Sequence, residues 1–218
     1  MNREEIDVLV NKYWPEFTFQ IPEPDRRYED HSSSQCYALV REFKPKACLE
    51  FGTSKGGATC VIMAALVKNK KEDNLPFRFI TSELLPELTV MAADNIYNQC
   101  RELPVMCGKI EDNLWIIPKG RELDFVFIDT DHDLENTKWY ITNILPRIKT
   151  GGLVAIHDWA VRERDGGLVG KGPGETGGWP ETDFIMDLVR KGEWPMEKLY
   201  WNYEEGNGEE GSFWIKNG

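Results

Sequence analysis

The chain has 218 residues, and its 26 Lys and Arg against 37 Asp and Glu give a formal net charge of -11. This length suits one sizeable domain, and the negative charge opposes contact with a phosphate backbone, so we expect no nucleic-acid partner. No apolar run approaches the roughly 20 residues that a bilayer-spanning helix needs, and the polar start MNREEIDV lacks the apolar core of a signal peptide. We therefore expect a cytoplasmic protein with no membrane partner.

Two stretches near the start have apolar residues at helical spacing, on either side of a Pro-rich connection. They predict a helical cap over residues 1–45. From Ala47 the pattern changes to short apolar runs, which are ACLEFG, FRFITSE, PVMCG, DFVFID and GLVAIHD. Runs of this kind are typical of parallel strands that are buried on both faces.

The stretches between these runs, at about 57–68, 86–100 and 135–147, have helical apolar spacing. Right-handed crossovers between parallel strands would place these helices on both faces of the sheet. Residues 46–159 are therefore expected to form the core of a doubly wound α/β fold, and that core is also the expected cofactor-binding part.

A Gly-rich stretch over residues 160–180 follows the last of these runs, and it predicts either a lid over the site or an ordinary loop. A helix is expected around 181–191. The runs KLYWNY and SFWIK then predict an antiparallel hairpin, so that residues 181–218 complete a mostly parallel, seven-stranded sheet. We expect a single domain over 1–218.

The turn after the first predicted strand has the composition of a ligand-binding loop. Its glycines allow close approach of backbone to a ligand, and the helix that follows offers free N–H groups to an anion. The loop lacks the spacing G-x-G-x-x-G and a Gly-Lys-Ser/Thr ending, which disfavours dinucleotides and triphosphates. An acid directly before the turn would suit an ammonium or sulfonium ligand. The expected cofactor residues here are Glu50, Gly52, Thr53, Ser54, Gly56, Gly57 and Thr59.

Two further segments extend this predicted cofactor site. Glu83 ends the second predicted strand, where this architecture hydrogen-bonds a ribose diol. After the third run, Lys109, Ile110 and Glu111 are expected to form an adenine pocket, with Ile110 packed on the ring. Taken alone, each acid is more often a solvated residue at a strand end.

The ordered series from about Ala47 to Trp159 resembles class I S-adenosylmethionine (SAM)-dependent methyltransferases. In this family an acid precedes a glycine-rich turn and a second acid ends the next strand. The resemblance implies a Rossmann-like methyltransferase fold, SAM as cofactor and a small-molecule methyl acceptor. It leaves the acceptor's identity and a homo-oligomeric state open.

The fourth and fifth runs end in acids and histidines, which predict the chemical site. Neighbouring parallel strands lie about 4.8 Å apart, so their end residues can converge. The resemblance to small catechol-type O-methyltransferases implies a divalent metal, manganese or magnesium, held by Asp129, His157 and Asp158. The chain departs from the family pattern at two of these three positions, and an imidazole in place of a carboxylate favours manganese, iron or zinc over magnesium. This departure leaves open that no metal binds. Asp129 is also expected to contact the cofactor.

His132 is the expected general base, because it follows Asp129 by three residues, where catechol-type enzymes have a lysine. An imidazole with an ordinary pKa of about 6.5 suits this task, and sugar-hydroxyl and antibiotic-tailoring O-methyltransferases resemble the chain here. In the alternative, Asp131 or Asp133 caps the following helix and His132 is exposed in the turn.

Two other functions stay open at this point. One is a non-catalytic module that keeps the nucleotide pocket for binding or regulation, and Asp129, His132 and Asp158 speak against it because a module needs none of them. The other is an NAD-dependent oxidoreductase, which the missing G-x-G-x-x-G motif disfavours.

Overall fold

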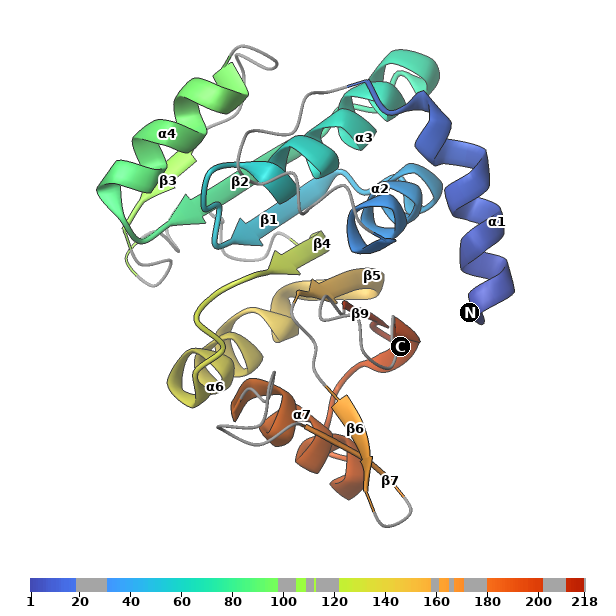
Figure 1. Cartoon of the computed structure of the whole chain (residues 1–218), viewed down its shortest axis with the longest axis vertical. Helices are drawn as coiled ribbons and strands as arrows, with labels where there is room; N and C mark the ends of the chain where they lie inside the picture. The colour runs from blue at the N-terminus through green and yellow to red at the C-terminus, as the bar shows by residue number, and fades with distance from the viewer. Residues whose placement is uncertain are drawn as a thin grey trace.

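The computed structural model describes residues 1–18, 31–97, 105–108, 112, 122–157, 161–164, 167–170, 180–201 and 211–217. Its main sheet has seven strands in the order β3-β2-β1-β4-β5-β9-β8 (Figure 1). These strands are β1 (Ala47–Phe51), β2 (Arg78–Glu83), β3 (Val105–Cys107), β4 (Leu123–Ile128), β5 (Ile148–Ile156), β8 (Glu197–Trp201) and β9 (Ser212–Ile215).

The first five strands are parallel, and the last two complete the sheet in the opposite sense. β1 pairs with β2 on one side and with β4 on the other, so the strand order reverses between β1 and β4. β9 lies antiparallel between β5 and β8. The predicted doubly wound, mostly parallel sheet with an antiparallel C-terminal hairpin is confirmed. Ligands of open α/β sheets bind beyond the carboxyl ends of the strands where the order reverses.

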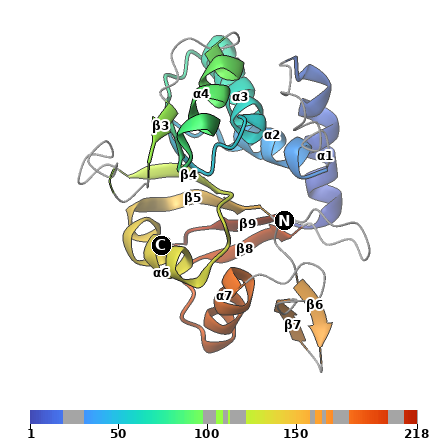
Figure 2. The ribbon, with the colours of Figure 1, turned by 60° about the vertical axis from the view of Figure 1, so that its left-hand side comes forward.

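Helices cover both faces of this sheet (Figure 2). The helices α2 (His31–Phe43), α3 (Gly57–Asp73) and α4 (Pro86–Tyr97) lie on one side, and α6 (Leu134–Asn143) and α7 (Pro180–Lys191) lie on the other. Phe125 and Phe127 of β4 pack toward α2 and α3, while Val126 and Ile128 face the opposite core. This alternation buries β4 on both faces, which explains its continuous apolar run.

The N-terminal segment packs on the helical layer rather than on the sheet alone. α1 (Arg3–Tyr13) begins with a capping box, in which the Asn2 side chain and the Glu5 side chain each accept a hydrogen bond from the other residue's backbone. A short 3-10 helix, η1 (Trp14–Glu16), follows it. Ile6 of α1 is fully buried in the same core as Leu39 of α2. The two predicted N-terminal helices are thus confirmed.

The remaining elements include one that the sequence did not indicate. β6 (Val161–Arg164) and β7 (Gly167–Gly170) pair as a separate antiparallel hairpin inside the stretch expected to be a lid or loop. A second 3-10 helix, η4 (Leu145–Arg147), precedes β5. Among the described residues, no helix has the length and apolar character needed to cross a bilayer.

Candidate functional site

The turn between β1 and α3 lies against the end of β4. Gly52 has φ +83, and a Cβ there would lie 1.6 Å from the backbone oxygen of Asp129. The Gly52 and Thr53 amides both donate to the Ser82 carbonyl, at 3.0 and 3.2 Å, and the Asp129 amide donates to Phe51, at 2.9 Å. The ends of β1, β2 and β4 are therefore locked together at one edge, where Figure 1 shows their arrowheads pointing the same way.

Glu50 is a fully buried acid beneath the first turn of α3. Its Oε2 accepts a hydrogen bond from the Thr59 hydroxyl at 2.6 Å. Its Oε1 makes no hydrogen bond within the described residues. Burial raises the pKa of Glu50 to about 8, the hydroxyl groups of Thr59 and Thr81 oppose this rise, and the charges of Asp129 and Glu83 add to it. A cationic ligand at this edge would stabilise the ionised form.

Glu83 ends β2 and holds the glycine-rich loop in place. Its Oε2 accepts from the Ser54 amide at 2.7 Å and its Oε1 from the Leu85 amide at 3.0 Å. Each carboxylate oxygen has a second lone pair, so Glu83 can still accept from a ligand hydroxyl. In the described part of the chain, neither Glu50 nor Glu83 is paired with a cationic side chain.

Two predicted residues of the chemical site meet at the ends of β4 and β5. Nδ1 of His157 lies 3.5 Å from Oδ1 of Asp129. Within the described residues, no cluster of three or more His, Cys, Asp and Glu side chains could hold a metal ion. The described donors therefore do not complete the predicted metal site. Asp158, the third predicted ligand, lies outside the described residues.

His132 is buried in the turn between β4 and α6, with 3% of its surface exposed and φ +55. Its Nε2 lies 4.0 Å from Oδ1 of Asp129, and its Nδ1 lies 2.7 Å from Oε2 of Glu181 in α7. The next residue, Asp133, caps α6 by accepting a hydrogen bond from the Asn136 amide at 2.7 Å. The expected cap is confirmed at Asp133, whereas the alternative in which His132 is exposed is wrong.

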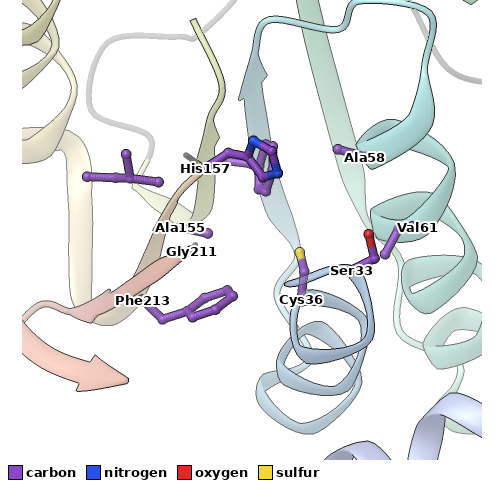
Figure 3. Close-up of a pocket in the computed structure, with 10 residues that line it drawn as sticks. Ser33, Cys36, Ala58, Val61, Ala155, His157, Gly211 and Phe213 are labelled. Atoms are coloured by element: carbon purple, nitrogen blue, oxygen red, sulfur yellow. The ribbon is translucent and has the colours of Figure 1, made fainter. Parts of the chain in front are cut away.

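A small pocket lies beside this edge, between the sheet and helices α2 and α3 (Figure 3). Figure 3 shows the His157 imidazole at one end of it, across from Ala58, with Cys36 and Phe213 toward the other end. The enclosed part of the pocket, with a volume of about 10 Å³, has room for about one water molecule.

A comparison with models of protein families identifies the family of the chain. Residues 49–159 match the model of a family described as "Methyltransferase domain". The chain belongs to this methyltransferase family. Among curated proteins, no sequence matches it.

Solved structures show the same fold as this methyltransferase over nearly its whole length. An O-methyltransferase from Bacillus cereus, in complex with SAH, is 17% identical with a TM-score of 0.59, over 98% of this chain and 90% of that one. The O-methyltransferase TomG from Streptomyces achromogenes, in complex with SAM, is 16% identical with a TM-score of 0.63, over 100% and 92%. A SAH-bound methyltransferase from Podospora anserina is 15% identical with a TM-score of 0.62, over 100% and 97%. The expected class I methyltransferase fold is confirmed.

The methyltransferase brings most of its predicted site residues to one edge. The Gly52 to Thr59 loop, Glu50, Glu83, Asp129, His132 and His157 all lie at or beneath the carboxyl ends of β1, β2, β4 and β5. The predicted adenine pocket of Lys109, Ile110 and Glu111 lies outside the described residues. Sequence reasoning missed Glu181, whose only local signal is its place in the first turn of a predicted helix.

Proposed function

We propose that the chain is a SAM-dependent O-methyltransferase that acts on a hydroxyl group of a small acceptor. The observation that carries this proposal is the buried acid Glu50, which has one oxygen without a hydrogen bond in the described residues and a pKa raised to about 8. A buried carboxyl of this kind favours a cationic ligand. SAM carries both a sulfonium and an ammonium group, whereas NAD and ATP present phosphates, which these acids would repel.

The residues at the edge fit SAM as follows. Glu50 and the Gly52 loop would hold the amino-acid end of the cofactor, and Glu83 would accept hydrogen bonds from the ribose hydroxyls. Lys109, Ile110 and Glu111 remain the proposed adenine pocket. Asp129 lies against Gly52 at the end of β4, which supports a place beside the cofactor.

The proposed chemistry needs little covalent work from the protein. When bound, SAM supplies a methyl group on a positively charged sulfur, and transfer of that methyl leaves neutral SAH. His132 would accept at Nε2 the proton that the acceptor hydroxyl loses as its oxygen bonds to the methyl carbon. The fixed strand ends would align the reacting groups and exclude water from them. The O-methyltransferases with the same fold support oxygen as the acceptor atom.

Calorimetry tests the cofactor assignment. SAM and SAH should bind, and NAD and ATP should not. Glu83→Ala should weaken SAH binding by about 1.5–3 kcal/mol for each lost hydrogen bond to the carboxylate, which is roughly 10- to 150-fold for one bond. Unchanged affinity in Glu83→Ala would remove the ribose assignment. Tight NAD binding would favour the oxidoreductase instead.

Turnover tests the assignment of His132 as base. A panel containing catechol, a simple phenol and a methyl glycoside should reveal an acceptor through release of SAH. His132→Ala should then lower turnover by roughly 10²–10⁴-fold, with SAH affinity nearly unchanged. Titratable groups surround the imidazole, because Asp129 and Glu181 lie beside it, His157 lies beside Asp129, and Tyr140 lies beside Glu181. Turnover is therefore measured across pH in the wild type and in His132→Ala. Near wild-type turnover in His132→Ala with an unaltered acidic limb would exclude His132.

A divalent metal stays a prediction, and the proposed proton transfer to His132 does not require it. Asp129 and His157 would supply two of its ligands and Asp158 the third. Loss of turnover after exhaustive chelation, restored by manganese at least as well as by magnesium, would support the metal. Full turnover after chelation would leave these acids the task of orienting His132. Cofactor binding with no turnover on any acceptor would instead support a binding or regulatory module.

A further inference from the structure

Glu181 is a buried acid that α7 holds against the turn carrying His132. Its side chain is only 1% exposed, and its Oε2 lies 2.7 Å from Nδ1 of His132. Its backbone amide donates to the His132 carbonyl at 3.2 Å. His132 is thus fixed to α7 through both its ring and its backbone, although the two residues lie 49 positions apart in the sequence.

The Tyr140 hydroxyl holds the second carboxylate oxygen of Glu181. It donates to Oε1 at 2.7 Å. Burial, followed by the charge of Glu181, raises the pKa of Tyr140 well above its usual value, so this hydroxyl keeps its proton. Glu181 also lies in the first turn of α7, where the helix dipole stabilises negative charge. Both carboxylate oxygens therefore act as hydrogen-bond acceptors.

We propose that Glu181 is a positioning residue that accepts a hydrogen bond from the Nδ1–H of His132 and leaves the lone pair on Nε2. This inference rests on the proposed function, in which Nε2 is the base. Nε2 is the ring nitrogen that lies 4.0 Å from Asp129, at the end of β4 and beside Gly52. The contact with Glu181 thus selects the tautomer whose unprotonated nitrogen is Nε2, on the side of Asp129 and the cofactor edge.

Glu181 would also support the ring after proton transfer. Once Nε2 has taken a proton, the imidazolium carries a positive charge 2.7 Å from the Glu181 carboxylate. Loss of the orienting carboxylate in the Ser-His-Asp triad, which produces the wrong tautomer, lowers turnover by about 10⁴-fold. An orienting acid can therefore matter nearly as much as the base itself.

Nuclear magnetic resonance of the ring nitrogens tests the tautomer without any acceptor. The chain has three histidines, so protein labelled with nitrogen-15 histidine gives three sets of ring signals, and His132→Ala identifies one of them. In the SAH-bound wild type, at a pH where His132 is neutral, we expect the proton on Nδ1. A proton on Nε2 would overturn the proposal, whatever the variants do.

A matched pair of variants tests whether Glu181 causes this preference. Tyr140→Phe removes the other partner of the carboxylate and should keep the Nδ1–H signal. Tyr140→Phe combined with Glu181→Leu removes the acceptor without leaving the tyrosine hydroxyl unpaired, and it should lose that preference. An unchanged His132 tautomer in the combined variant would overturn the proposal.

Turnover separates positioning from a general structural role. With the best acceptor of the panel, Glu181→Leu should lower turnover by roughly 10²–10⁴-fold, with SAH affinity within about 2-fold of wild type. Adding Glu181→Leu to His132→Ala should cause no further loss, because Glu181 acts through His132. A further loss of tenfold or more would overturn the proposal. If His132→Ala keeps full turnover while the wild type shows Nδ1–H, the base assignment fails and the orientation by Glu181 stands.

Discussion

A single buried acid, Glu50, gives the site a sensitivity to pH. Because its pKa is raised to about 8, Glu50 is largely protonated at pH 7 in the ligand-free protein. A sulfonium or ammonium ligand stabilises the carboxylate, so binding near pH 7 should release close to one proton. As the pH rises toward 8, the affinity for SAM should increase by up to about tenfold per pH unit. Above pH 8 the affinity should level off.

Calorimetry in two buffers with different heats of ionisation measures this proton release. Glu50→Gln cannot release a proton, and it should bind SAM more weakly with the same heat in both buffers. Equal heats for the wild type at pH 7 would show that Glu50 does not ionise on binding.

Glu50 also links the stability of the ligand-free protein to pH. Its folded pKa of about 8 lies above the ordinary value of 4.5, so between these two pH values the folded state holds a proton that the unfolded state has lost. Stability therefore falls as pH rises through this window, by up to about 1.4 kcal/mol per pH unit from this group. Urea unfolding at pH 6 and 8 measures how the free energy of unfolding changes with pH. This change should be smaller in Glu50→Gln than in the wild type.

At the scale of an element, the β1–α3 turn depends on the absence of a side chain at Gly52. A Cβ there would overlap the Asp129 carbonyl, whereas Gly151 has a similar φ of +78 with nothing within 4 Å of its Cβ position. Gly151→Ala should therefore cost only the backbone strain, about 1–2 kcal/mol. Gly52→Ala should cost at least about 3 kcal/mol and abolish SAM binding. Equal losses in urea unfolding would show that β4 can move away from the turn.

The strands were predictable from sequence because burial on both faces removes polar residues from them. Alternate residues of β4, such as Phe125 and Val126, enter opposite cores, so all four residues from Phe125 to Ile128 are apolar. Glu50 and Glu83 were predictable as site residues because Glu50 lies just before the glycine-rich turn and Glu83 ends the next predicted strand. Their positions at strand ends converge through the topology alone.

Other parts of the site depend on contacts that no local pattern contains. Glu181 reads as a solvated acid in the first turn of a helix, and only the packing of α7 against α6 buries it beside His132. The same contact buries His132, which stands among polar residues in the sequence and resembles an exposed turn residue. The β6–β7 hairpin was missed because its glycines favour a loop.

At the scale of the whole molecule, Arg41 joins the N-terminal helices to the far end of α3. It is 4% exposed and hydrogen-bonds the Asn69 side chain, Glu72 Oε2 at 2.5 Å and Glu16 Oε2 at 3.5 Å. Both glutamates are partly exposed, so water can hydrate them after Arg41 is removed. Arg41→Met should therefore cost about 2–3 kcal/mol, less than breaking a fully buried pair.

An exposed ion pair on the same face provides the control. Lys44→Met breaks the 2.9 Å pair with Asp73 and should cost less than about 1 kcal/mol. Urea unfolding measures both losses, and hydrogen exchange should show faster opening of α1 and α2 in Arg41→Met alone. Glu72 lies about 22 Å along α3 from the glycine loop, so SAH affinity should not change. Equal losses in the two variants would show that the buried Arg41 network adds no stability.

The position of β9 between β5 and β8 also has a consequence for biosynthesis. β5, which leads to His157, bonds to β9 through pairs such as Ala155 with Phe213, and the Gly151 amide donates to the Lys216 carbonyl. While a ribosome is still making the residues before 212, a nascent chain that has formed β1 to β5 exposes an unpaired apolar strand edge. Such an edge can pair with other chains, so this is the stage of synthesis at which a chaperone would protect the protein most.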